Sequence, residues 1–131
     1  MIGLDTNIVL RLLLQDDVEH YSRAGAALRS MTPDEAVFVG PVVVQEAVWA
    51  MLKVRAMSKT TVLQLLRDLL DQDDLVIGGR TALERALDAW DGGPADFADY
   101  FIAELNIEAG CRSTLTFDAK AAKHPAFSPV P

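Results

Sequence analysis

Five carboxylates in this chain have types and positions suited to metal chemistry. Asp5 ends the opening run MIGLD, and Asp118 ends the run STLTFD. Asp96 and Asp99 are three residues apart, a spacing that puts two side chains on one face of a helix. Glu46 lies within the apolar run PVVVQEAVWAML, where a charge is costly unless it is paired, exposed or bound to a cation. Together these acids could assemble into a site for a divalent metal ion.

The donor atoms indicate which metal such a site would take. Several carboxylates at one edge of a sheet repel one another and raise each other's pKa unless a divalent cation neutralises them. Oxygen donors suit Mg²⁺ or Mn²⁺, whereas zinc favours histidine and cysteine, of which the chain has two and one. Any one of these acids alone is more commonly a helix cap, a turn former or a solvated side chain. The prediction of Mg²⁺ or Mn²⁺ therefore depends on all five acids together.

Basic side chains near these acids are few. His20 and His124 are expected to be solvated. Arg11, Lys120 and Lys123 could each contact a phosphate, although solvated faces of short helices commonly carry such residues. No general base can be assigned from the sequence.

Charge and cysteine content limit the class of protein. Acids outnumber Lys and Arg by 19 to 12, giving a net charge of −7, so no basic field over the whole molecule exists to hold nucleic acid. The single cysteine, Cys111, can form neither an internal disulfide nor a thiolate zinc cage, and we expect it to be buried. With no signal peptide and no run approaching ~18 apolar residues, a soluble cytoplasmic protein without membrane contact is expected.

Hydrophobic periodicity predicts the elements that position the acids. Strands are predicted at residues 1–5, 36–40, 73–79 and 113–117. Helices are predicted at residues 7–17, 18–30, 41–55, 59–71, 80–91, 94–110 and 118–124, with a turn at 32–35. This alternation favours an α/β fold: one domain over residues 1–131, with a central parallel sheet of about four to five strands, helices on both faces and a short Pro-rich tail at 125–131. In such sheets ligands bind beyond the carboxyl ends of the strands, where Asp5 and Asp118 lie.

One predicted helix, at residues 59–71, carries an apolar stripe at helical spacing. Ser58 can cap it. The stripe is either internal core or a surface for a partner, and consists of Val62, Leu65, Leu66, Leu69 and Leu70.

Four segments in order resemble the motifs of a known family, the PIN-domain ribonucleases, and within it the VapC-type toxins of bacterial toxin–antitoxin pairs. IGLDTNIVLRLL resembles the opening motif, with Asp5 as its first metal-binding acid, and VVVQEAVWAML resembles the segment that carries the second acid, Glu46. PADFADYFIAELNIEAGC resembles the third motif, with Asp99 as the usual carboxylate and Asp96 as an extra acid; TLTFD resembles the fourth, with Asp118. The resemblance covers nearly the full length of the chain.

The chain departs from the family pattern in the third motif. Tyr100 and Phe101 stand where small or aliphatic residues are more usual, and Glu104 stands where alanine is frequent. We expect these residues to alter packing or to add a peripheral acid, with the metal site kept.

The resemblance implies a Mg²⁺- or Mn²⁺-dependent endoribonuclease that cuts RNA by in-line attack of water, leaving 5′-phosphate and 3′-hydroxyl ends. Its catalytic acids would be Asp5, Glu46, Asp99 and Asp118, and its metal ligands Asp5, Asp99, Asp96 and Asp118. Thr6, Asn7 and Thr116 would support them. We expect Thr6 and Asn7 to cap the following helix or to hold the Asp5 loop by local hydrogen bonds.

The resemblance also implies partners. These are an RNA substrate such as tRNA or another structured RNA, a cognate antitoxin that covers the site, and a second copy of the chain in a homodimer.

Two other functions remain open from the sequence. A catalytically degenerate PIN-like domain would act only as an RNA- or protein-binding module. A small phosphatase or phosphotransferase would use Asp5 as its nucleophile, but such enzymes carry a second Asp two residues later, and this chain has Asn7 there.

Overall fold

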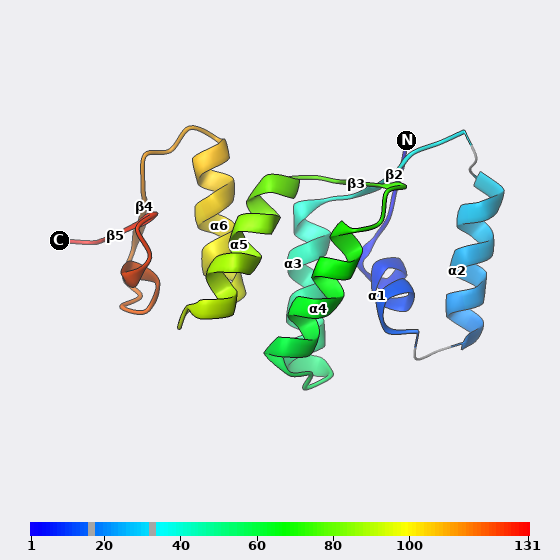
Figure 1. Cartoon of the computed structure of the whole chain (residues 1–131), viewed down its shortest axis with the longest axis horizontal. Helices are drawn as coiled ribbons and strands as arrows, with labels where there is room; N and C mark the ends of the chain where they lie inside the picture. The colour runs from blue at the N-terminus through cyan, green and yellow to red at the C-terminus, as the bar shows by residue number, and fades with distance from the viewer. Residues whose placement is uncertain (16–17, 32–33) are drawn as a thin grey trace. The chain divides into compact units, whose positions relative to one another are not determined.

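Helices and parallel strands alternate along the chain in the computed structural model, which describes residues 1–15, 18–31 and 34–131 (Figure 1). The chain divides into two compact units, unit 1 at residues 1–78 and unit 2 at residues 79–131, and each is described by itself. Residues 32–33 of the predicted turn and residues 16–17 of the helix predicted at 7–17 lie outside the described residues.

Unit 1 contains a three-stranded parallel sheet. Its strands are β1 (Ile2–Gly3), β2 (Val37–Val39) and β3 (Leu75–Ile77), in the order β1-β2-β3. Residue 37 pairs with residue 2 on one side and with residue 75 on the other, so β2 is central. The alternating burial of β2, with residues 37 and 39 inside, reflects the two-residue period of a strand.

Four α-helices connect these strands along the chain. They are α1 (Thr6–Leu14), α2 (Val18–Met31), α3 (Pro41–Trp49) and α4 (Lys59–Leu70). α3 starts directly at Pro41, whose fixed φ and missing N–H suit the first helical position. The predicted single helix at 41–55 is two segments, because α3 continues into a π-helix, η1 (Ala50–Val54).

The apolar stripe of α4 is mostly core. Ser58 caps the helix as predicted, its Oγ accepting the N–H of Thr61 at 3.2 Å. Val62 and Leu66 are 0% exposed and Leu69 is 7% exposed. Most of the stripe is therefore internal to unit 1, and the reading as a partner surface is wrong for these three residues.

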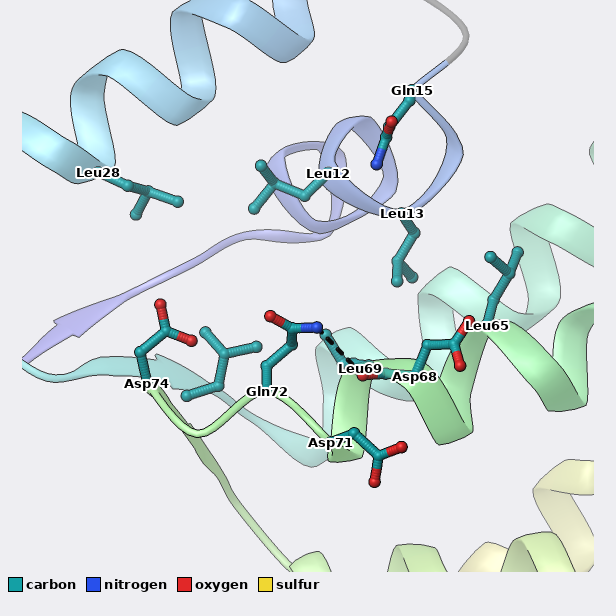
Figure 2. Close-up of a pocket in the computed structure, with 11 residues that line it drawn as sticks. Leu12, Leu13, Gln15, Leu28, Leu65, Asp68, Leu69, Asp71, Gln72 and Asp74 are labelled. Atoms are coloured by element: carbon teal, nitrogen blue, oxygen red, sulfur yellow. Dashed lines mark hydrogen bonds between the residues drawn. The ribbon is translucent and has the colours of Figure 1, made fainter.

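A hollow of about 570 Å³, here called the leucine hollow, lies beside the end of α4. Figure 2 shows Leu12 and Leu13 of α1 and Leu28 of α2 around it. The other lining residues come from the end of α1, from α4 and from the approach to β3: Gln15, Leu65, Asp68, Leu69, Asp71, Gln72, Asp74 and Leu75. Three of these are acids. Gln72 is held there by a hydrogen bond from its Nε2 to the carbonyl oxygen of Asp68 at 3.4 Å (Figure 2). The leucine hollow thus has an apolar lining and acids around it.

Unit 2 is built on a pair of helices, α5 (Arg80–Gly92) and α6 (Phe97–Glu108). Both bury a face: Leu83 and Leu87 are 0% exposed, and the rings of Trp90 and Phe97 meet edge to face with centroids 5.4 Å apart. After α6 the chain forms β4 (Thr114–Thr116), a 3₁₀ turn, η2 (Ala121–Lys123), and β5 (Phe127–Pro129).

Two predictions for the C-terminal region are wrong. The Pro-rich tail contains a strand, β5, which pairs in parallel with β4 from residues 114↔127 to 116↔129, so STLTF is not the last strand. Proline is tolerated in β5 because an edge strand can lack one N–H donor. The closing helix predicted at 118–124 is reduced to the single turn η2.

Cys111 also differs from its prediction. It is exposed, in the turn that follows α6. Gly110 takes a positive φ of 95° there and reverses the chain, which puts Cys111 before β4 starts.

The prediction of an α/β fold with parallel strands is confirmed. The described strands fall into two ladders, one of three strands in unit 1 and one of two strands in unit 2. Within residues 1–15, 18–31 and 34–131, no helix combines the length and the apolar character needed to cross a membrane.

Candidate active site

Asp5 joins β1 to α1. It is the N-cap of α1, and its Oδ1 accepts the N–H of Ile8 at 3.0 Å. A carboxylate is favourable there because the first N–H groups of a helix lack partners and carry partial positive charge. The expectation that Thr6 or Asn7 would cap the helix is wrong, since both already belong to its first turn.

Glu46 lies on α3 and receives a partner from α1. Its Oε2 accepts the hydroxyl of Thr6 at 3.2 Å, between side chains that are 40 residues apart in sequence. Glu46 is exposed, so its charge in an otherwise apolar helix is both hydrated and hydrogen-bonded. Thr6 follows Asp5 directly. The hydrogen bond therefore links the helix that Asp5 caps, α1, to the helix that carries Glu46, α3.

The acids of unit 2 lie at the start of α6 and after β4. Asp96 is the N-cap of α6, and its N–H donates to Asp99 Oδ2 at 3.3 Å. Asp118 Oδ1 accepts the N–H groups of Lys120 at 2.7 Å and Ala121 at 3.1 Å.

Thr116 holds the other side of the Asp118 turn. Its Oγ1 accepts the N–H of Asp118 at 2.9 Å. Backbone and hydroxyl donors therefore fix the orientation of this carboxylate.

The three acids of unit 2 interact electrostatically. Burial raises the pKa of Asp99 above the usual aspartate value of 3.8, and repulsion from Asp118 and Asp96 raises it further, while the hydrogen bond from the N–H of Asp96 lowers it. Hard oxygen donors that repel one another fit a divalent cation, which would relieve that repulsion. Among the described residues, neither unit by itself gathers three or more His, Cys, Asp or Glu side chains into a group that could hold a metal ion.

The two histidines differ in their surroundings. His20 is exposed on α2, as expected. His124 is partly buried, which corrects its prediction as a solvated residue: its ring lies 5.4 Å from that of Tyr100 and 6.5 Å from that of Phe127. Its Nδ1 also accepts the N–H of Ala126 at 3.2 Å. His124 therefore helps to join η2 to β5.

The departures from the family pattern have structural roles. Tyr100 is 2% exposed, and its hydroxyl accepts the N–H of Ala95 at 3.1 Å, directly before Asp96. Phe101 is also buried, and Glu104 is 7% exposed, so these residues take part in packing, one of the two outcomes expected for them. Sequence reasoning missed the role of Tyr100, although a tyrosine among apolar helix residues indicates a hydroxyl that needs a partner.

The expected basic residues are divided between the units. Lys120 and Lys123 of unit 2 are exposed. Arg11 of unit 1 is partly buried and lines a second hollow with Asn7, an arrangement that sequence reasoning also missed.

Comparison with protein families identifies the class of this protein. The model of the PIN domain family matches residues 2–126, a span that includes all five acids. The chain therefore belongs to the PIN domain family, whose members are generally nucleases that hydrolyse nucleic acids. No curated protein matches the chain.

Proposed function

We propose that this chain is a Mg²⁺- or Mn²⁺-dependent endoribonuclease of the VapC type, the toxin of a toxin–antitoxin pair. One observation carries the proposal: the PIN family match extends over residues 2–126 and includes every acid that the sequence singled out. Those acids stand at a strand end, at helix starts and on α3, positions from which side chains can meet at a sheet edge.

The donor set supports a metal site. Asp5 and Asp99 would hold the principal ion, with Asp96 and Asp118 as further ligands and Glu46 beside them. The raised pKa of Asp99 favours this role, because a nearby cation offsets the repulsion that Asp99 experiences. When bound, such an ion supplies an acidified water and screens the phosphate charge.

The residues around the acids orient them. Asp5 uses Oδ1 in the helix cap, and a carboxylate has a second oxygen that can bind a ligand. Thr6 holds Glu46 on α3, and Thr116 holds the turn of Asp118. Such second contacts restrict the carboxylates to few conformations, which favours a well-defined metal geometry.

The net charge supports the proposed protein partner. A chain of −7 attracts a basic segment, and an antitoxin could place an Arg or Lys among the acids and so block them. We propose a homodimer in the cytoplasm that cleaves tRNA or another structured RNA until the antitoxin binds. A short open reading frame directly upstream would be the natural source of that antitoxin.

RNA cleavage by the full chain tests the proposal. The purified protein is incubated with a panel of RNAs that includes tRNA, in Mn²⁺, in Mg²⁺ and in EDTA, beside the Asp5→Asn variant. We expect 5′-phosphate products that require metal and that Asp5→Asn does not form. Tight RNA or protein binding without cleavage would instead identify a degenerate binding module, and a trapped aspartyl-phosphate on Asp5 would identify a phosphotransferase; either result overturns the proposal.

A further inference from the structure

A hollow of about 640 Å³, here called the arginine hollow, lies between α1 and α2 of unit 1. It is lined by Asn7, Ile8, Arg11, His20, Arg23, Ala24 and Ala27. We propose that the arginine hollow binds a backbone phosphate of the RNA substrate and so positions the strand beside Asp5. This inference rests on the proposed function and adds a substrate subsite to it.

The lining follows the period of two facing helices. On α1, Ile8 and Arg11 are three residues apart and Asn7 and Arg11 are four apart, so they share one face. On α2, lining residues recur at positions 20, 23, 24 and 27, again one face of a helix. The hollow is therefore formed by two regular helix faces.

The chemistry of the lining suits a phosphodiester. Arg11 and Arg23 carry permanent positive charge, and guanidinium groups match phosphate oxygens with paired donors. Asn7 and His20 add side-chain donors of the kinds that contact nucleic-acid backbones. None of the described residues that line the hollow is acidic, although the whole chain carries −7. The described lining of the arginine hollow thus carries two guanidinium groups and no carboxylate.

The leucine hollow of the same unit shows the opposite chemistry. It is lined by six leucines among other residues and by Asp68, Asp71 and Asp74, which repel phosphate. The two hollows have comparable volumes, about 570 and 640 Å³, so size does not distinguish them. Both are large enough for a nucleotide-sized ligand, and only the charge of the arginine hollow favours one.

The place of the arginine hollow connects it to the proposed reaction. Asn7 is two residues after Asp5, in the first turn of the helix that Asp5 caps. At ~1.5 Å of rise per residue, the hollow begins within one helical turn of that carboxylate. A phosphate bound by the arginines would thus be close along the strand to the phosphate that is cut. The arginines would bind and orient the substrate without acting as acid or base.

A matched pair of variants on α2 tests the subsite. Ala27 and Ala26 are adjacent and both exposed, but only Ala27 lines the hollow. Ala27→Glu puts a carboxylate into the hollow, and Ala26→Glu adds the same charge outside it, at the same small cost in helix propensity. Binding of a fluorescein-labelled single-stranded RNA oligonucleotide is measured by anisotropy in EDTA, so that no cleavage occurs.

We expect Ala27→Glu to raise the Kd by about 10-fold relative to Ala26→Glu, because a carboxylate next to phosphate is repelled. Equal Kd values for the two variants overturn the subsite. Absence of RNA binding by the parent chain in EDTA also overturns it, because the arginines need no metal to be charged.

A second pair of variants tests whether the contact is electrostatic and controls for misfolding of the first pair. Arg23→Gln removes a lining charge, and Arg29→Gln removes a charge from the same helix outside the hollow. Only Arg23→Gln should lower the slope of log Kd against log salt, by about 0.7, the value for one phosphate contact to a single strand. Equal slopes overturn the proposal.

The parent chain separates this inference from the proposed function. If the parent binds RNA through the hollow but cuts none with Mn²⁺, the nuclease proposal fails and the subsite remains. If the parent cuts RNA while Ala27→Glu binds it as well as Ala26→Glu does, the nuclease proposal stands and the subsite fails.

Discussion

Asp5 and Asp99, the two acids that we propose as principal metal ligands, have opposite surroundings. Asp5 is exposed at the end of β1, where the start of α1 gives it an N–H donor and a favourable field. Asp99 is partly buried in unit 2, which raises its pKa, and two further carboxylates raise that pKa further. The unit 1 acid is stabilised by the protein itself, whereas the unit 2 acid pays an electrostatic cost that a cation would offset.

This difference concerns what holds each set of acids. In unit 1, hydrogen bonds to Asp5 and from Thr6 to Glu46 set the geometry of the carboxylates. In unit 2, Asp96 and Asp118 repel Asp99. We therefore expect a bound cation to relieve repulsion around Asp99.

Substitution of Asp5 or Asp99 is expected to have the largest effect on RNA cleavage. We expect Asp5→Asn and Asp99→Asn each to lower the rate of Mn²⁺-dependent RNA cleavage by more than about 100-fold, because even outer contacts of metal sites are worth 10–100-fold. The rate is measured by gel under single-turnover conditions.

Asp34→Asn in unit 1 and Asp88→Asn in unit 2 serve as matched controls with the same change of charge. A variant of Asp5 or Asp99 that cuts RNA like its control would exclude that residue from the metal site.

The hydrogen bond between Tyr100 and Ala95, directly before Asp96, is expected to have the next largest effect when it is removed. Tyr100→Phe removes the hydroxyl that accepts the N–H of Ala95 and leaves that buried donor without its partner. We expect the free energy of unfolding to fall by about 2 kcal/mol, within the range for a buried polar group that loses its hydrogen bond. Urea denaturation followed by circular dichroism measures it. An unchanged midpoint and slope would show that the hydroxyl does not hold the loop.

Loss of the hydrogen bond from Thr6 of α1 to Glu46 of α3 is predicted to have a smaller effect on RNA cleavage. Thr6→Val keeps the shape of the side chain but removes the donor to Glu46, and we expect RNA cleavage to slow by about 10-fold, as for other outer contacts of metal sites. Thr6→Ser keeps the hydroxyl and should retain most of the activity. If both variants were equally impaired, the lost packing and not the hydrogen bond would be responsible.

Titration of Asp99 tests the electrostatic half of the comparison directly. Carboxyl NMR without metal should give a pKa above 3.8, and Asp118→Asn should lower it only in part, because burial is the larger cause. Asp88→Asn should leave it unchanged. A normal pKa for Asp99 would remove the proposed demand for a cation.

The same pKa predicts the direction of a stability effect. Because the folded protein holds the proton of Asp99 more tightly than the unfolded chain, this group stabilises the fold at pH values below 3.8. That contribution is lost as the pH rises through the raised pKa. Asp99→Asn should remove this pH dependence in urea denaturation, and an unaltered pH profile would contradict it.

Local patterns in the sequence predicted much of the fold. The stripe of α4 and its Ser58 cap depend on neighbours within one helix, so periodicity and capping preference are sufficient. The starts of α1 and α6 were predicted less well, because the helices were expected at 7–17 and 94–110, whereas Asp5 and Asp96 are their N-caps.

Features that depend on distant pairing were not predicted. β5 forms because residues 127–129 find a partner in β4, whereas proline and the short length conceal a strand in the local sequence. The bond from Thr6 to Glu46 and the arginine hollow depend on which helix faces meet, information that a single periodic segment lacks. The five acids could be chosen from the sequence, but their partners could not.

Anomalous diffraction from crystals grown with MnCl₂ tests the central claim most directly, that the acids proposed as ligands bind a divalent metal ion. The account predicts a manganese peak coordinated by oxygens of Asp5 and Asp99. A peak without these oxygens among its ligands, or no peak near these residues, would contradict it.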